Sequence, residues 1–268
     1  MITFDDVTHF NTFGYIAQRQ LFSADEVAQL REEFDAVLAK DFPQFDNSQS
    51  VNSTYICDRA EGLLKTLPVD DRIYDIPLKV LGHDFQYEGS GGHWHVGDTP
   101  WHGGSGVQHW PLPHIKVSLY LDELKKGAGE LRVIPGSHRN YLRHVDPRWG
   151  HAPDYLFPLR NRNTHDDFRP WGLRPDEVPH IAIESDPGDV LMFTEDILHA
   201  SFGSPQMRRQ LTINFLAYPR SDAQVHALLE RVGDSLQVPA SYLSSDDPRR
   251  VKMVSRLDEI GFARADEL

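Results

Sequence analysis

Histidine is the residue type whose placement in this sequence points to chemistry. The chain has 14 histidines, and many of them crowd between His83 and His114. His102 lies in the stretch GDTPWHGG, and His199 lies in the distant stretch DILHAS. A neutral imidazole is a common ligand of iron, and all-β enzymes bring ligands from separate strands to one end of a barrel. Because each histidine alone also fits a structural role, the assignment depends on what accompanies the pair.

Other functional classes are excluded by composition. Cys57 is the only cysteine, so an intrachain disulfide or a metal site built on several cysteines cannot form. Lysine and arginine total 27 against 40 aspartates and glutamates, and the formal charge is −13. This acidic balance disfavours binding to nucleic acid or to an anionic membrane surface. We therefore expect no nucleic acid and no membrane as partners.

The chain is expected to be a single soluble domain, residues 1–268, in the cytoplasm. Its first residues lack the basic and apolar regions of a signal peptide, and no stretch approaches 18 apolar residues. With 268 residues, 40% of them hydrophobic, one large core is available. No internal repeat or clean linker divides the sequence.

The elements that must position the histidines follow from hydrophobic periodicity. Ser23 and Glu26 form a capping box, and apolar residues at helical spacing follow it, so we expect an amphipathic helix over about 23–40. Residues 42–112 carry many Gly, Pro, Asn and Ser and only short apolar runs such as 77–81, which indicates short strands and long loops.

A series of apolar runs indicates the core strands. These runs are 115–121, 130–135, 182–184, 190–193 and 210–215. Helix-like runs follow at 223–232 and 248–260. The segment 139–181 has little periodicity and is expected to be a lid-like insert between strands.

Several motifs occur together in the order of one known family. They are GDTPWH at 97–102, KVSLYLD at 116–122, GELRVIPGSHR at 129–139, PGDVLMF at 187–193, HAS at 199–201 and RRQLTINF at 208–215. In these motifs, from about residue 80 to 220, the chain resembles the phytanoyl-CoA dioxygenase family of iron(II)- and 2-oxoglutarate-dependent oxygenases. The resemblance implies a mainly β fold, a double-stranded β-helix (a cupin-like jelly roll) with flanking α-helices. It also implies that His102 and His199 bind Fe(II).

The resemblance further implies an arginine that binds the distal carboxylate of 2-oxoglutarate as a bidentate pair. Arg208 and Arg209 both stand at the expected place. Because alternate residues of a strand share a face, Arg208 lies with the polar side chains of its strand and is the first choice, with Arg209 the alternate. Ser201 matches a position that contacts 2-oxoglutarate, although a local turn hydrogen bond is equally compatible. Lys116 either reaches the cofactor or is a solvated edge residue.

The sequence departs from the family pattern at one position. The family has His-x-Asp, whereas His102 is followed by Gly103 and Gly104, so Gly104 stands where the third iron ligand is expected. The same replacement is the hallmark of the iron/2-oxoglutarate halogenases, in which chloride binds the metal at that place. The resemblance then implies a halogenase with Gly104 at the chloride site. It would use O₂, convert 2-oxoglutarate to succinate and CO₂, and chlorinate an unactivated C–H.

Three alternatives remain open. Asp98, four residues before His102, is a candidate for the missing carboxylate. The protein can also be a hydroxylase of the phytanoyl-CoA dioxygenase family in which water or substrate completes the iron site. The third alternative is a non-catalytic relative.

The substrate is expected to be a free small molecule of specialised metabolism, such as an amino acid or a nucleotide. His138 and Arg139 either point into the substrate chamber or belong to a turn that follows a core strand. The arginines and aromatic residues of the segment 139–181 suit an anionic, ring-bearing molecule, but the same segment carries balancing aspartates. No basic helix for an acidic carrier protein is evident, so a carrier-bound substrate is not expected.

Overall fold

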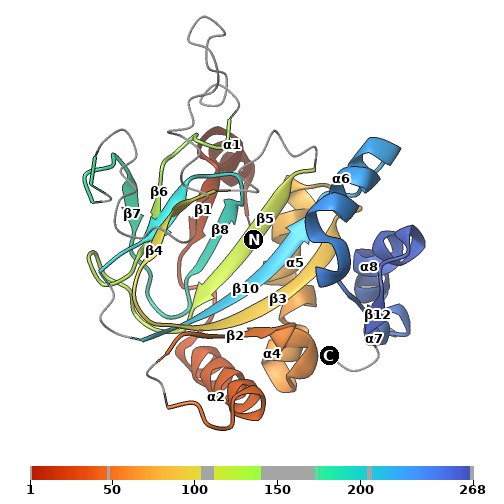
Figure 1. Ribbon diagram of the computed structural model, residues 1–268, viewed down its shortest axis with the longest axis horizontal. Coiled ribbons are helices and arrows are strands. Elements are labelled where there is room, and N and C mark those ends of the chain that lie inside the picture. The colour runs from red at the N-terminus through yellow and green to blue at the C-terminus, as the bar shows by residue number, and fades with distance from the viewer. Residues whose placement is uncertain are drawn as a thin grey trace, which may run out of the picture.

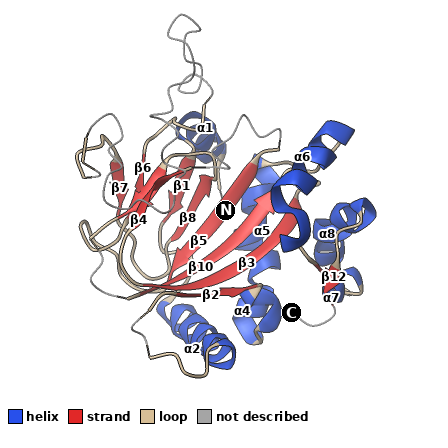
Figure 2. Ribbon diagram, viewed as in Figure 1, coloured by secondary structure: helices blue, strands red, loops and turns tan. Residues whose placement is uncertain are grey.

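The computed structural model describes residues 2–46, 49–103, 112–139, 173, 174, 176–203 and 207–265. Two antiparallel sheets lie at its centre, and helices cover the larger one (Figures 1 and 2). The six-stranded sheet has the order β1-β8-β5-β10-β3-β2, and the four-stranded sheet has the order β4-β9-β6-β7. Antiparallel sheets with flanking helices agree with the expected fold class.

The strands of the larger sheet are β1 Tyr15–Gln18, β2 Val51–Thr54, β3 Gln86–His95, β5 His114–Tyr120, β8 Val190–Thr194 and β10 Arg208–Leu216. Those of the smaller sheet are β4 Thr99–His102, β6 Leu131–Val133, β7 Ile181–Ile183 and β9 His199–Ser201. The helices are α1 Phe4–Phe13, α2 Ala24–Asp41, α3 Ile56–Arg59, α4 Gly62–Thr66, η1 Leu67–Val69, α5 Asp71–Val80, α6 Asp222–Val232, η6 Gly233–Ser235, α7 Ala240–Leu243 and α8 Pro248–Ile260. A short parallel pair, β11 Val238–Pro239 and β12 Arg264–Ala265, lies near the C-terminus.

The larger sheet is covered on both faces, which explains why the central strands β5 and β8 are buried along almost their whole length although β5 also carries polar residues. One face presents residues such as Val117, Ile213 and Phe215 to the helices in the main hydrophobic core. The other face, called the inner face below, is turned toward the four-stranded sheet. There Phe193 of β8 packs with Leu131 and Val133 of β6 in a second core cluster. The inner face is thus where side chains from both sheets meet.

The expected amphipathic helix is confirmed as α2, with Ser23 as its N-cap and the capping box with Glu26 present. The expected core strands and both C-terminal helices are also found, within a few residues of their predicted bounds. The prediction of only short strands and loops over 42–112 is wrong for residues 56–80, which form three helices and one 3₁₀ turn. In α5, Asp70 caps the N-terminus and the buried residues recur at helical spacing, so Pro77 is accommodated inside the helix.

Most of the expected insert, 140–172 and residue 175, lies outside the described residues. Within the described part of the chain, no helix is long and apolar enough to cross a membrane.

Candidate functional site

The two candidate ligand histidines face each other across neighbouring strands of the smaller sheet. β4 pairs with β9 in a register that sets His102 opposite His199. Their ring centroids are 4.0 Å apart. Residues separated by 97 positions in the sequence thus form one pair of imidazoles, as a shared metal site requires.

Backbone carbonyls hold both rings in one tautomer. Nδ1 of His102 lies 2.8 Å from the carbonyl oxygen of Pro100, and Nδ1 of His199 lies 2.9 Å from that of Ile197. Because a carbonyl oxygen only accepts, each Nδ1 carries the proton and each Nε2 keeps its lone pair. A metal-binding histidine is commonly oriented by such a hydrogen bond from its other ring nitrogen. Both rings therefore fit metal coordination through Nε2.

Electrostatics keep His199 neutral. Burial holds the pKa of His199 well below its usual value, and the neighbouring His102 lowers it further. A ligand imidazole must be unprotonated, so this environment favours a metal over a proton at the site.

No protein carboxylate joins the pair in the described part of the chain. Among those residues, no group of three or more His, Cys, Asp or Glu side chains is placed to hold a metal. Asp98 instead accepts the backbone N–H of Gly203 at 2.8 Å. It lies four residues before His102, outside β4. Gly104 lies outside the described residues.

Arg208 places a buried positive charge in the interior. It is 3% exposed, and its Nη2 donates to Oγ of Ser201 at 2.8 Å while Nη1 donates to the carbonyl of Gly97 at 3.3 Å. Among the described residues no carboxylate forms an ion pair with it. Ser201 in turn donates to the carbonyl of Gly129 at 2.7 Å, which fixes its hydroxyl. A buried guanidinium without a direct ion-pair partner is unfavourable, so this arrangement fits an anionic ligand.

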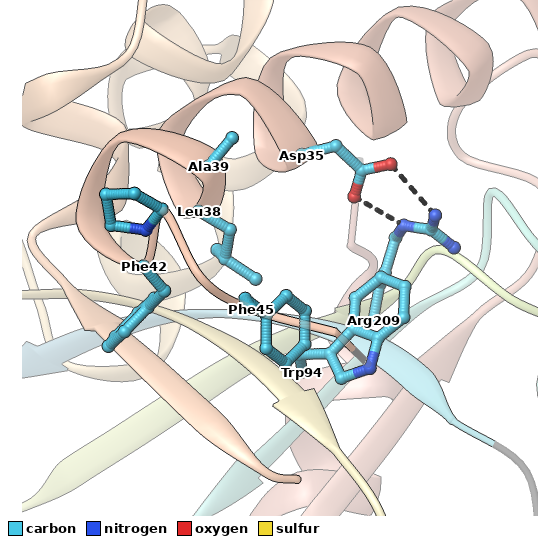
Figure 3. A pocket seen from close by; sticks show the side chains of 8 residues that line it. Asp35, Leu38, Ala39, Phe42, Phe45, Trp94 and Arg209 are labelled. Atoms are coloured by element: carbon cyan, nitrogen blue, oxygen red, sulfur yellow. Dashed lines mark hydrogen bonds and ion pairs between the residues drawn. The ribbon is translucent and has the colours of Figure 1, made fainter. Parts of the chain in front are cut away.

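Arg209, the next residue of β10, points toward Asp35 of α2 (Figure 3). Because successive side chains of a strand alternate, it lies on the face opposite to Arg208. Its Nε and Nη2 bind both carboxylate oxygens of Asp35 at 2.8 and 2.9 Å, and its Nη1 lies 3.1 Å from Asp122. The guanidinium stacks over Trp94 beside a pocket of about 290 Å³ at the end of α2. Two carboxylates and an aromatic ring already engage Arg209, so Arg208 is the better placed of the two arginines for a ligand carboxylate.

Lys116 is ion-paired on the inner face of β5. Its Nζ lies 3.1 Å from Oε1 of Glu195. Glu195 also binds Nη2 of Arg231 at 2.6 Å and lies 3.5 Å from Nδ1 of His114, which forms a further ion pair with Glu88. The pKa of Glu195 lies well below its usual value. Burial acts to raise this pKa, but the positive charges of His114, Lys116 and Arg231 together outweigh burial.

This cluster draws on four separate segments of the chain and is not predicted by the sequence motifs. The one available signal was alternation along β5, which puts His114 on the same face as Lys116. Glu88, Glu195 and Arg231 carried no local signal.

His138 and Arg139 lie in a turn that docks against α1. The Arg139 guanidinium donates to the carbonyl of Asn11. The ring of His138 lies where a Cβ at Gly14 would be, and Gly14 has φ +86°. Oγ of Ser137 accepts the N–H of Leu198 at 2.8 Å. The turn thus supports the residue that precedes His199, and the substrate role of His138 and Arg139 remains a prediction.

A sequence pattern described as "Phytanoyl-CoA dioxygenase (PhyH)" matches residues 10–210. The chain is 28% identical over 244 residues to an ectoine dioxygenase of Sphingopyxis alaskensis, covering 80% of this chain and 72% of that protein. It is 25% identical over 245 residues to an ectoine dioxygenase of Stutzerimonas stutzeri, covering 82% and 78%.

Solved structures share the fold. EctD from S. alaskensis with bound Fe superposes with a TM-score of 0.58 and 24% identity, over 81% of this chain and 77% of that chain. HygX from Streptomyces hygroscopicus with nickel and 2-oxoglutarate bound superposes with a TM-score of 0.62 and 16% identity, over 81% and 88%.

Proposed function

This chain belongs to the phytanoyl-CoA dioxygenase family and is an iron(II)- and 2-oxoglutarate-dependent oxygenase, and we propose that it hydroxylates a C–H bond of a free small molecule. The observation that carries the proposal is the pair His102 and His199, oriented through Nδ1 and accompanied by the buried cation Arg208. We take the two facing sheets to be the double-stranded β-helix that the resemblance implies.

Each part of the site has a role in this proposal. His102 and His199 would hold iron through Nε2, and Arg208 with Ser201 would hold the distal carboxylate of 2-oxoglutarate. Iron, when bound, would activate O₂, with one oxygen atom entering the substrate C–H bond and the other entering succinate as 2-oxoglutarate loses CO₂. Phe193, whose ring centroid lies 4.8 Å from that of His199, provides an apolar wall that excludes water.

The hydroxylase needs an oxygen ligand beside the two histidines. Asp98 is oriented toward Gly203 rather than toward His102, so water or the substrate is the better candidate. Ectoine is the first substrate to test because the curated relatives are ectoine dioxygenases.

One observation favours a second candidate function, a halogenase. The sequence after His102 reads Gly103-Gly104, so no side-chain carboxylate follows it at the family position. Glycine leaves room for an anion and adds no negative charge, which suits chloride at that place. Under this proposal the enzyme chlorinates an unactivated C–H of a small molecule.

One product analysis tests both proposals. The protein is incubated with Fe(II), 2-oxoglutarate, O₂ and a panel of ectoine, amino acids and nucleotides, with and without chloride, and products are identified by mass spectrometry. A hydroxylase gives a product with one added oxygen at either chloride concentration. A halogenase gives the paired isotope signature of chlorine only with chloride present. Absence of metal-dependent 2-oxoglutarate binding and of succinate would contradict both and favour a non-catalytic relative.

A variant pair at position 104 separates the two enzymes further. Gly104→Asp adds a carboxylate that excludes chloride by occupancy and charge, so chlorination should be lost. Gly104→Ala adds volume without charge and serves as the matched control. Equal loss in both variants would indicate a steric effect and contradict the role of charge at this position.

A further inference from the structure

A second cation lies on the inner face of the sheet, far from the candidate cofactor clamp. Lys116 of β5 stands opposite Asn214 of β10, six residues along that strand from Arg208. At about 3.3 Å per residue, the two backbone positions are about 20 Å apart. Ser201 holds Arg208 at one end and Glu195 holds Lys116 at the other. One carboxylate therefore cannot bind both cations.

Lys116 faces the same interior as the histidines. Asn214, opposite Lys116, shares its face of β10 with Thr212, whose Oγ1 lies 3.4 Å from Nε2 of His93. Lys116 also pairs in register with Phe193, the residue that packs against His199. A ligand held by Lys116 would thus lie on the His199 side of the interior.

The Lys116 ammonium has capacity for a further partner. It has three N–H donors, and Glu195 is its single carboxylate within ion-pair distance in the described part of the chain. Glu195 shares its charge with Arg231 and His114 as well. The Lys116 side chain is 25% exposed, so a ligand can reach it.

Two buried polar atoms lie beside Lys116 without hydrogen bonds. Within the described structure, Oδ1 of Asn214 and Oγ of Ser118 have no hydrogen-bond partner. Both residues are on the inner face, Asn214 directly opposite Lys116 and Ser118 two positions along β5. Buried polar groups in folded proteins are normally hydrogen-bonded, so these two atoms have capacity for a further partner. The Ser118 hydroxyl can donate to an anion, whereas the Asn214 amide accepts through Oδ1 and donates through Nδ2.

We propose that Lys116, together with the Ser118 hydroxyl and the Nδ2 amide group of Asn214, donates hydrogen bonds to an anionic group of the substrate, a carboxylate or a phosphate. Arg208 serves the cofactor and Lys116 the substrate. Glu195 is a positioning residue that holds the Lys116 side chain through their ion pair. This inference rests on the proposed function, because it places the anion-bearing substrate beside the pair His102 and His199.

Anion binding to the full chain tests the assignment without knowledge of the substrate. Inorganic phosphate, followed by ³¹P NMR, and acetate, followed by saturation-transfer ¹H NMR, are titrated in the presence of saturating 2-oxoglutarate. We expect the wild type to bind phosphate or acetate under these conditions. Lys116→Met should weaken this binding at least about tenfold, whereas Lys116→Arg should retain it. Lys125→Met, at an exposed lysine paired with Glu123 and Asp186, is the matched control.

A second variant is needed if Lys116→Met has a much lower melting temperature than the wild type. Asn214→Asp places a carboxylate opposite Lys116 and should exclude phosphate and acetate while leaving the lysine in place. Stronger binding of phosphate than of acetate assigns a phosphate ester as the substrate group, and the reverse assigns a carboxylate.

Two results would overturn the inference. One is that 2-oxoglutarate displaces all bound phosphate and acetate, and the other is that Lys116→Met and Asn214→Asp bind them as the wild type does. Failure of the proposed function has a different signature, because Arg208→Met would then leave 2-oxoglutarate binding unchanged. The titration with phosphate or acetate tests the Lys116 site, and the titration with 2-oxoglutarate tests the Arg208 site.

Discussion

Gly103 packs against the backbone carbonyl of Ile197. A Cβ added at Gly103 would lie 2.8 Å from that oxygen, closer than ordinary contact allows. The same oxygen accepts the Nδ1–H of His199 at 2.9 Å. The residue after one candidate iron ligand therefore leaves room for the carbonyl that orients the other.

Gly103→Ala should weaken metal binding. The added methyl group pushes on the Ile197 carbonyl and disturbs the hydrogen bond that fixes the His199 tautomer. Loss of such outer contacts typically lowers metal affinity about 10–100-fold. Titration of the protein with Fe(II) under anaerobic conditions measures the effect.

The control for this prediction is Gly261→Ala. Gly261 caps α8 with φ +98°, so alanine there is strained but remote from the histidines. This control should lower the melting temperature and leave iron affinity unchanged. Unchanged iron affinity in Gly103→Ala would show that the carbonyl contact does not matter.

His102→Ala and His199→Ala should each abolish turnover and strongly reduce bound iron. With only these two histidines proposed as protein ligands, neither can compensate for loss of the other. Iron content and 2-oxoglutarate consumption are measured together. His226→Ala, at an exposed histidine of α6, should behave as the wild type. Near-normal iron content in either ligand variant would place the metal elsewhere.

Arg208→Ala should weaken 2-oxoglutarate binding far more than Arg209→Ala. Removing one partner of a buried, hydrogen-bonded charge pair costs on the order of 2–5 kcal/mol. Arg209 is instead occupied by Asp35 and Asp122, so its loss should affect mainly stability. Calorimetric titration with 2-oxoglutarate gives the two affinities, and the reverse order would exchange the roles of the two arginines.

Asp58 should make stability depend on pH. Burial raises its pKa to about 6, although Tyr87 donates to its carboxylate at 2.7 Å. Because the folded state binds this proton more tightly than the unfolded chain, the free energy of unfolding falls as pH rises from about 4 to about 6. Asp58→Asn removes the charge and should be the more stable protein at pH 8, on the order of 1–3 kcal/mol. The difference should shrink toward pH 4.

Urea unfolding at several pH values measures this difference. The exposed carboxylate Asp71 supplies the control variant, Asp71→Asn, which should show no comparable trend. A gap between Asp58→Asn and the wild type that does not change between pH 4 and 8 would contradict the prediction.

Local periodicity was enough to predict several elements. The capping box at Ser23 and Glu26 predicted the start of α2, because capping and helical spacing depend on residues a few positions apart. Alternation along β10 separated Arg208 from Arg209, and in the structure Arg208 donates to Ser201 while Arg209 binds Asp35 on the other face of the strand. The helix α5 was not predicted because a proline such as Pro77 usually interrupts a helix. The helix forms in the folded protein, where one of its faces is buried in the core.

Contacts between distant segments were decided by the tertiary structure alone. The sequence by itself determined which residue types are available: two histidine stretches, an arginine pair and a glycine where a carboxylate is expected. The register of β4 against β9 sets His102 opposite His199, and no local pattern encodes a register across 97 residues. In the same way, Lys116 meets Glu195 only because β5 pairs with β8, the strand that ends just before Glu195. Strand pairing and turn geometry are properties of the whole fold, and they decide which of the available side chains become neighbours.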